Sequence, residues 1–269
     1  MKDAGFEQAI QWYPGHMVAA MRRMADYIKL VDVVIEVADA RVPLSGFNPM
    51  LDEAAANKRR LKILTRDDLA ERPETVRWLE VLGAPSLSVN ARTQGAFVEV
   101  KRRLRALIGD GHRPQRALVV GIPNSGKSSV INGLAGRSVA RTEDRAGVTR
   151  QLQWFKVGAD LEIMDTPGIL VPRIASTDAQ WKLALVGAVP RDRYDPEDVA
   201  ERFHRWLTEK TGGRTKVPGL PAFAQARGFV RRGGESDYHN AARSYVKDFN
   251  DGKFGRITLE SATRDVETA

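Results

Sequence analysis

Short runs of β-branched and other apolar residues alternate with amphipathic stretches through the first two thirds of the chain. This alternation is typical of an α/β fold, in which a parallel sheet is connected by crossover helices. Four apolar runs predict buried strands, at 31–37, 61–64, 85–89 and 117–120. Two later runs, 151–157 and 161–164, predict a strand pair joined by Gly158-Ala159-Asp160.

The pattern changes near Pro190 and becomes helical. Residues 196–206 begin with proline and acidic side chains, as a helix start does, and residues 236–249 form a second amphipathic segment. A basic stretch rich in glycine and proline, 211–221, separates them. We therefore expect two domains: an α/β domain over residues 1–185 and a smaller α-helical domain over residues 186–269.

Composition narrows the class of protein. Of 269 residues, 42% are hydrophobic, which is too apolar for a disordered chain and too polar for a membrane protein. There is no cysteine, so disulfides and thiolate metal sites are excluded. No run approaches the roughly 18 apolar residues of a membrane span. The first ten residues carry Asp3 and Glu7 and lack a signal-peptide core, so we expect a cytoplasmic protein.

The clearest chemical signal is Gly121-Ile122-Pro123-Asn124-Ser125-Gly126-Lys127-Ser128, which matches the P-loop pattern G-x-x-x-x-G-K-[ST] between a predicted strand and a predicted helix. Backbone N–H groups of such a loop wrap a phosphate at the helix N-terminus. Lys127 would contact the β- and γ-phosphates and the Ser128 hydroxyl would bind Mg²⁺. The predicted phosphate contacts also include Asn124, Ser125, Gly126 and Ser129.

Two further motifs downstream indicate a GTPase-type phosphate site. Asp165-Thr166-Pro167-Gly168 follows a predicted strand, where Asp165 would hold a Mg²⁺-bound water and the Gly168 N–H would meet the γ-phosphate. Thr149 lies between the motifs and could bind Mg²⁺ and the γ-phosphate when its loop orders. We also hypothesise that the Asn124 amide helps to coordinate K⁺ beside the phosphates.

The base-binding motif lies upstream of the P-loop. Guanine is usually read by Asn-Lys-x-Asp at the end of a strand, and the nearest match is Thr65-Arg66-Asp67-Asp68. Asn90-Ala91 ends the next strand, where the loop that backs the base is expected. The motifs thus run base, phosphate, switch and metal, which is a circular permutation of the usual order. Such a permutation is physically allowed because a sheet needs only the same strands side by side.

With these motifs in this order, the chain resembles the circularly permuted ribosome-biogenesis GTPase A family (YlqF/RbgA type). The resemblance implies a circularly permuted P-loop GTPase sheet with a smaller helical domain. It implies a cytoplasmic GTPase that binds a late precursor of the large ribosomal subunit, contacts its rRNA and is released on hydrolysis. The motifs that carry the resemblance are 12–17, Asp39-Ala40-Arg41-Val42-Pro43, the P-loop, Asp165-Thr166-Pro167-Gly168-Ile169, and segments within 248–260.

The base motif departs from the family pattern. Only Asp68 keeps its expected chemistry, in which the carboxylate accepts hydrogen bonds from the guanine N1–H and amine. Arg66 could lay a cationic plane over the purine, while Thr65 is too short to replace every amide contact. We expect guanine selectivity to survive in weakened form, because adenine presents an acceptor at N1 to the carboxylate.

Ras-like enzymes orient the attacking water with a glutamine after the Asp-x-x-Gly motif, but here Ile169 and Leu170 follow Gly168. The family resemblance assigns that role to His16, which could equally be a helix-start or RNA-contact residue. A neutral imidazole can accept a hydrogen bond from water near pH 7. The expected catalytic residues are therefore His16, Lys127 and Thr149.

The net charge of +8, from 42 Lys and Arg against 34 Asp and Glu, permits a polyanionic partner. One basic cluster, at 101–116, is interpreted as the solvated face of a crossover helix. A second, at 210–232, holds six cations and no acid, and is predicted to contact RNA phosphates. Trp206, Phe223 and Phe229 could stack on bases, but aromatics at helical spacing are more often core.

The leading hypothesis is a GTP-hydrolysing assembly factor for the large ribosomal subunit, monomeric away from the ribosome and without a membrane partner. Its partners would be rRNA and ribosomal proteins of the precursor. The alternative is a nucleotide-dependent RNA- or protein-binding module with negligible hydrolysis, which the missing glutamine and altered base motif keep open. A small-molecule kinase is a distant third, because no acceptor site or lid is evident.

Overall fold

The computed structural model describes residues 24–83, 85–109, 113–140, 153–166, 176–231, 233–263 and 265. The chain forms two compact units, which are described separately below. One contains the described residues of 24–166 together with 257–265, and the other contains those of 176–256. This division differs from the expected one, because residues 176–185 belong with the helical unit and 257–265 return to the α/β unit.

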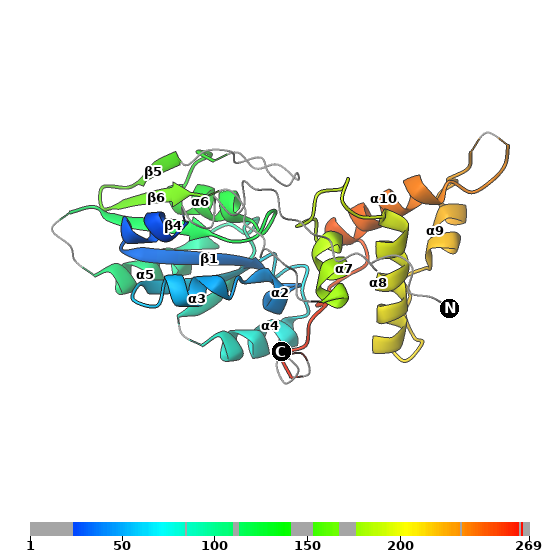
Figure 1. Cartoon of the computed structure of the whole chain (residues 1–269), viewed down its shortest axis with the longest axis horizontal. Helices are drawn as coiled ribbons and strands as arrows, with labels where there is room; N and C mark the ends of the chain where they lie inside the picture. The colour runs from blue at the N-terminus through cyan, green and yellow to red at the C-terminus, as the bar shows by residue number, and fades with distance from the viewer. Residues whose placement is uncertain are drawn as a thin grey trace. The chain divides into compact units, whose positions relative to one another are not determined.

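A six-stranded sheet forms the centre of the α/β unit (Figure 1). Its strands are β1 (Val33–Asp39), β2 (Arg59–Thr65), β3 (Ser86–Val89), β4 (Gln115–Val120), β5 (Gln153–Val157) and β6 (Leu161–Asp165). Their order across the sheet is β3-β2-β1-β4-β6-β5. Every neighbouring pair is parallel except β5 with β6, the predicted strand pair, which is antiparallel. The order places β1, the first strand in the described part of the chain, in the interior of the sheet, between the predicted base strand and the P-loop strand.

Helices cover both faces of this sheet, and every residue of β1 is buried. Its odd-numbered residues, such as Ile35, pack in a core with α5 (Phe97–Ile108) and α6 (Lys127–Ala135). Ala38, on the opposite face, packs with the fully buried Trp78 of α4 (Arg72–Leu82). Two short helices, α2 (Pro43–Gly46) and α3 (Met50–Ala54), follow β1. A strand buried on both faces reads as a continuous apolar run, which is why the sequence predicted it well.

The helical unit contains α7 (Thr177–Leu185), α8 (Pro196–Lys210), α9 (Leu220–Ala226) and α10 (Tyr238–Asn250). Aromatic side chains form its centre: the Phe203 ring lies 5.1 Å from that of Phe249, and Phe223 lies 5.0 Å from Tyr245. The predicted helices at 196–206 and 236–249 are confirmed. α9 was not predicted, because its seven residues lie at the end of a segment dominated by glycine and proline.

No helix in the described part of the chain is long and apolar enough to cross a membrane.

Candidate nucleotide-binding site

The predicted site residues that the structure describes collect at one edge of the sheet. Because β1, β2, β3, β4 and β6 are parallel, their carboxyl ends meet there, and ligands of open α/β sheets bind at that edge. The strand register pairs Asp39 with Thr65, Thr65 with Val89, and Val119 with Asp165. The expected base motif, P-loop and metal carboxylate therefore come from adjacent strands although they lie far apart in the sequence.

The P-loop connects β4 to α6, as its motif predicted. Lys127 is the first residue of α6, and its ammonium Nζ donates to the carbonyls of Gly121 at 3.1 Å and Ile122 at 2.8 Å. The Lys127 side chain therefore lies inside the loop and bonds to the residues at its start. Ser128 and Ser129, the next residues of the helix, are half-buried. Helix N-termini present free N–H groups, so this loop geometry suits a phosphate.

Burial lowers the pKa of the Lys127 ammonium from 10.5 to about 8, although the Asp165 carboxylate opposes this shift. A buried ammonium group favours an anionic ligand beside it, because a phosphate would stabilise the charge that water no longer solvates. The electrostatics of the loop therefore match its motif.

Two glycines allow the P-loop to approach its neighbours. A Cβ on Gly121 would lie 2.2 Å from the Val37 carbonyl oxygen, so no larger residue fits there. Gly126 has φ +91°, and its added Cβ would lie 3.1 Å from Thr65 Oγ1. The P-loop is consequently packed directly against β1 and the end of β2.

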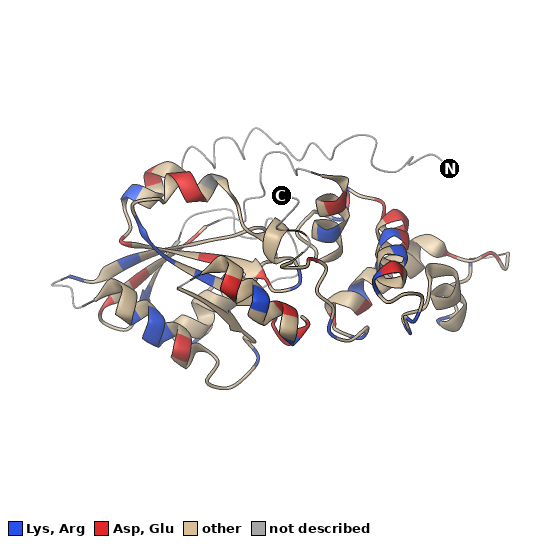
Figure 2. Ribbon diagram, turned by 90° about the horizontal axis from the view of Figure 1, so that it is seen from below, with Lys and Arg blue, Asp and Glu red and all other residues tan. Residues whose placement is uncertain are grey.

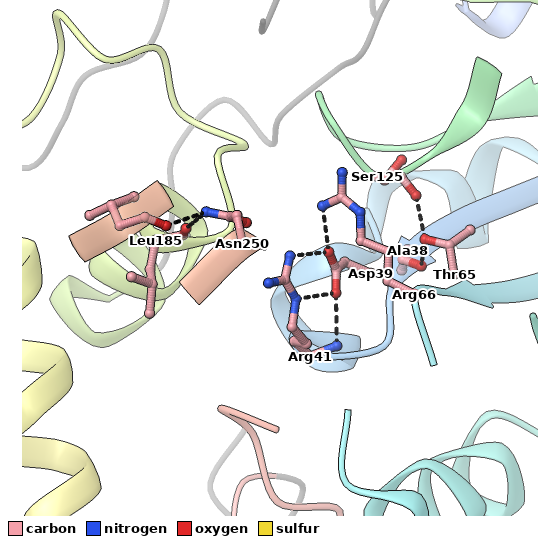
Figure 3. Close-up of polar contacts among 9 residues, drawn as sticks. Ala38, Asp39, Arg41, Thr65, Arg66, Ser125, Leu185 and Asn250 are labelled. Atoms are coloured by element: carbon pink, nitrogen blue, oxygen red, sulfur yellow. Dashed lines mark hydrogen bonds and ion pairs between the residues drawn. The ribbon is translucent and has the colours of Figure 1, made fainter. Parts of the chain in front are cut away.

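Thr65 joins the base motif to the P-loop (Figure 3). Its hydroxyl lies 2.7 Å from the Ser125 carbonyl oxygen and 3.2 Å from that of Ala38, so it donates chiefly to Ser125. The side chain is only 2% exposed. The Thr65 hydroxyl thereby attaches the P-loop to the end of β2. The threonine side chain is long enough for this contact, although the longer Asn is usual at this position.

Arg66 is held by a buried carboxylate (Figure 3). Its Nη1 donates to Asp39 Oδ2 at 3.0 Å, while Arg41 donates to both oxygens of Asp39 through Nε at 2.9 Å and Nη2 at 2.8 Å. Burial would raise the pKa of the Asp39 carboxyl, but the two guanidinium groups outweigh burial and lower it from 3.8 to about 2. The position of the Arg66 guanidinium is therefore set by Asp39. The sequence suggested only that Arg66 could lie over the purine, and it did not predict this ion pair.

The remaining base-site residues border this arrangement. Asp68 is half-buried in the turn after β2, and Asp67 accepts a hydrogen bond from Ser88 Oγ at 2.9 Å. Asn90 follows β3 and its side chain accepts from the Arg92 N–H at 2.9 Å, while Ala91 is exposed. The structure thus brings the ends of β2 and β3 together as predicted.

Oxygen donors suited to Mg²⁺ lie at the phosphate end of the site. Asp165 ends β6 and is 3% exposed, and Ser128 lies in the first turn of α6. A hydroxyl and a carboxylate are hard oxygen ligands, which fit Mg²⁺ bound to a nucleotide. Three predicted site residues, His16, Thr149 and Gly168, lie outside the described residues.

Sequence reasoning did not place Asp39, Arg41 or Glu260 in the site. Asp39 and Arg41 belong to one of the motifs shared with the family, but nothing in their spacing showed that Asp39 binds Arg66. Glu260 also lies in a motif shared with the family, but its position far along the chain from Thr65 gave no indication that it contacts residues near the base site. These contacts depend on tertiary structure, which a single sequence does not display.

The fold and site define a P-loop GTPase whose motifs are circularly permuted. A family model described as "50S ribosome-binding GTPase" matches residues 116–210. "Ribosome biogenesis GTPase A" of Bacillus cereus is 37% identical, with 94% of each chain covered, and its Thermotoga maritima namesake is 33% identical over 93% of this chain and 94% of that protein. The chain belongs to the ribosome biogenesis GTPase A family, and it is a GTPase.

Solved structures of similar proteins support the same fold. The GNP-bound crystal structure of YlqF from T. maritima has a TM-score of 0.72 and 29% identity, covering 91% of this chain and 99% of that one. The GDP-bound structure of the T. maritima protein has a TM-score of 0.71, also at 29% identity, covering 89% of this chain and 99% of that one. The predicted circularly permuted GTPase sheet with a smaller helical region is confirmed.

Proposed function

We propose that this GTPase is an assembly factor for the large ribosomal subunit, which binds precursor subunits in the GTP state and is released on hydrolysis. Two observations support the proposal: the intact P-loop in a permuted sheet, and similarity to ribosome biogenesis GTPase A along nearly the whole chain. The comparisons do not favour a module without hydrolysis. The proposed location is the cytoplasm, as a monomer away from the ribosome.

Within the site, Lys127 would neutralise the β- and γ-phosphate oxygens, and the loop from Asn124 to Ser129 would supply N–H donors. Ser128, Asp165 and Thr149 would hold Mg²⁺ directly or through water, and the Gly168 N–H would meet the γ-phosphate. When bound, Mg²⁺ supplies positive charge that stabilises the phosphates during transfer. Replacing Lys127 with Ala should abolish measurable nucleotide binding, which displacement of a fluorescent GDP analogue would test.

Asp68 is the proposed guanine reader, with Thr65, Arg66, Asn90 and Ala91 around the base. Its carboxylate would accept from the guanine N1–H and amine, whereas adenine offers an acceptor at N1. The protein should therefore bind GDP more tightly than ADP, and Asp68→Asn should reduce that preference. Equal affinity of the wild-type protein for both nucleotides would contradict the assignment.

His16 is the proposed residue for positioning the attacking water, because residues 169 and 170 are Ile and Leu. If it has this role, His16→Ala should lower turnover in the presence of large subunits while leaving GTP affinity unchanged. Turnover within about twofold of wild type would assign His16 to structure or RNA contact instead.

Asn124 is the proposed ligand of a monovalent cation. Its backbone adopts φ +57°, which places the residue at a sharp turn of the P-loop. The proposal predicts faster turnover in potassium than in sodium at equal ionic strength. Equal turnover in the two salts would contradict it.

RNA contact is proposed for the basic stretch of the helical unit. Acids of α10 and of the residue just before it neutralise part of the stretch, since Arg227 pairs with Asp248 at 2.6 Å and Arg231 with Asp237 at 3.5 Å. Arg214 and Lys216 are exposed cations in the same stretch. Phe223 and Trp206 pack within the aromatic core, which favours the core interpretation over base stacking.

Four of the six Lys and Arg residues in the basic cluster of the α/β unit are paired with acids instead. Arg102 and Arg103 bind Glu99, Arg113 binds Asp32, and Arg116 binds Glu162. Figure 2 likewise shows basic and acidic residues interspersed along the helices. These ion pairs agree with the prediction of a solvated helix face. Arg214 and Lys216 are therefore the better candidates for RNA contact.

A further inference from the structure

The last described stretch of the chain returns to the nucleotide site. Residues 257–262, here called the C-terminal segment, follow directly after the helical unit but belong to the α/β unit. The segment is almost fully enclosed: Thr258 and Leu259 are each 1% exposed and Glu260 is 2% exposed. Burial of a charged side chain in a terminal segment is costly unless it is well hydrogen-bonded, so the contacts of Glu260 need an explanation.

The C-terminal segment is hydrogen-bonded to the end of the base loop, defined here as residues 65–71. The N–H of Ile257 donates to the carbonyl of Leu69 at 3.0 Å, and Leu69 directly follows the proposed guanine reader Asp68. Thr258 and Glu71 bind each other twice: the Glu71 N–H donates to Thr258 Oγ1 at 2.9 Å, and the Thr258 N–H donates to Glu71 Oε2 at 3.2 Å.

The same segment also fixes the residues on the other side of the base loop. The N–H of Leu259 donates to the Arg41 carbonyl at 2.8 Å. The Glu260 carboxylate accepts from the N–H of Leu44 at 2.6 Å and from that of Ser45 at 3.1 Å, at the start of α2. Arg41 in turn holds Asp39, to which Arg66 of the base loop is bound. One segment therefore supports the base loop both directly and through the Arg41 to Ser45 stretch.

Apolar and aromatic contacts complete the attachment to α4. The Trp78 indole N–H donates to the Glu260 carbonyl at 3.0 Å, and Ala262 packs in the core formed with Trp78 and Leu64. The base loop is thus enclosed between β2, α4 and the C-terminal segment. By contrast, the P-loop is joined to the base loop through Thr65, at the end away from this segment.

We propose that the C-terminal segment is a structural part of the base-binding site, and that Glu260 and Thr258 are positioning residues for guanine recognition. Thr258 would act through Glu71 of the base loop. Glu260 would act through Leu44 and Ser45, which follow Arg41 in the chain and so support its contact with Asp39. Neither residue is proposed to touch the nucleotide. The inference rests on the proposed role of Asp68. It predicts that loosening the segment impairs discrimination between bases while leaving binding of the phosphates intact.

The test uses the full chain and three nucleoside diphosphates, GDP, IDP and ADP, measured by displacement of a fluorescent GDP analogue. IDP keeps the N1–H of guanine and lacks its exocyclic amine, whereas ADP is bound chiefly through phosphates and ribose. Glu260→Gln should raise the Kd for GDP about tenfold, as expected for losing one charge-assisted hydrogen bond. The Kd for ADP should stay within about twofold, so the ADP-to-GDP ratio should fall about fivefold or more.

Asp32→Asn is the matched control. The Asp32 carboxylate also accepts from a backbone N–H, that of Arg116 at 2.9 Å, but it lies at the amino end of β1, away from the site. This variant should lower stability without changing the ADP-to-GDP ratio. If Glu260→Gln does not fold, Thr258→Val provides the measurement, since it removes only the hydroxyl that accepts from Glu71.

The possible results distinguish a failure of the positioning role of Glu260 and Thr258 from a failure of the proposed role of Asp68. A wild-type protein that binds GDP and ADP equally would contradict the role of Asp68 itself. A selective wild-type protein, with an unchanged ratio in both Glu260→Gln and Thr258→Val, would overturn the positioning role alone. A parallel loss of all three nucleotides would also overturn it, because that result indicates general destabilisation.

Discussion

At the scale of single residues, Asp39 determines how the base loop is held. It is 1% exposed and accepts hydrogen bonds from both Arg41 and Arg66. Arg66 itself has φ +55°, a backbone conformation that is uncommon for a residue other than glycine. The ion pair therefore supports a strained position next to the proposed guanine reader, which links the stability of the loop to its function.

Asp39 also predicts a pH dependence of stability. Its pKa in the folded protein, about 2, lies below the ordinary value of 3.8, so its contribution is fully present above pH 3.8 and is lost as the pH falls towards 2. The shift corresponds to about 2 kcal/mol. Asp39→Asn should cost about 3 to 5 kcal/mol at pH 7, because it leaves the buried Arg41 guanidinium without its charge partner.

Urea unfolding of the wild-type and Asp39→Asn proteins between pH 7 and pH 3 would measure this effect. The difference in unfolding free energy should be constant above about pH 5 and should narrow below pH 4. A difference that does not change with pH would show that the Asp39 carboxyl has an ordinary pKa.

Thr65 gives a prediction about the P-loop. Thr65→Val keeps the shape of the side chain but leaves the Ser125 carbonyl without the hydroxyl that now donates to it. The Kd for both GDP and ADP should rise about five- to tenfold, because the phosphate loop loses its tether. Thr65→Ser, which retains the hydroxyl, should bind nearly as the wild type does. Selective loss of GDP binding would indicate instead that Thr65 acts on the base.

The role of a residue was predictable from the sequence where a motif with fixed spacing defines it. It was not predictable where the role depends on a contact between residues that are distant in the sequence. Lys127 and Asp165 follow from the spacing of their motifs after apolar strands, and the structure places both at the predicted strand and helix ends. The pairing of Arg66 with Asp39 depends on the register of β1 with β2, which sets Asp39 beside Thr65. The pattern of apolar and polar residues in a single sequence does not show which residues of two strands lie side by side.

At the scale of elements, the parallel strands were predictable because each contains a short buried apolar run, such as residues 33–35 in β1 and 117–120 in β4. Helix α9 was not predicted because glycine and proline next to it in the sequence indicate a loop. The helix is stabilised by Phe223, which packs in the aromatic core. The C-terminal segment was assigned to the helical domain by its position in the chain. Its attachment to the α/β unit depends on side-chain contacts such as that of Thr258 with Glu71.

The packing of α5 against α6 predicts the effect of a glycine substitution. Gly133 of α6 faces Phe97 of α5 so closely that an added Cβ would lie 2.1 Å from the ring. Gly133→Ala should therefore destabilise the protein by about 1 to 3 kcal/mol, even though alanine favours helices. Phe97→Leu should relieve part of that cost in the double variant, measured by urea unfolding. A stabilised Gly133→Ala protein would contradict the observed helix contact.

At the scale of the whole molecule, the ion pairs on each unit indicate which basic surface is the better candidate for the proposed RNA contact. Arg214→Glu combined with Lys216→Glu should weaken binding to large subunits by tenfold or more and reduce its salt dependence. Arg102→Glu is the control, since Arg102 is already paired with Glu99 in the α/β unit. Sedimentation with purified subunits at several salt concentrations would measure both. Equal weakening by the two sets of variants would contradict the assignment to the helical unit.

We propose that GTP hydrolysis by this chain is coupled to the large ribosomal subunit. Phosphate release by the purified protein should be slow alone, because the usual glutamine is absent, and should rise several-fold when purified large subunits or their precursors are added. Small subunits should have no effect. Turnover that is the same with and without large subunits would contradict the account.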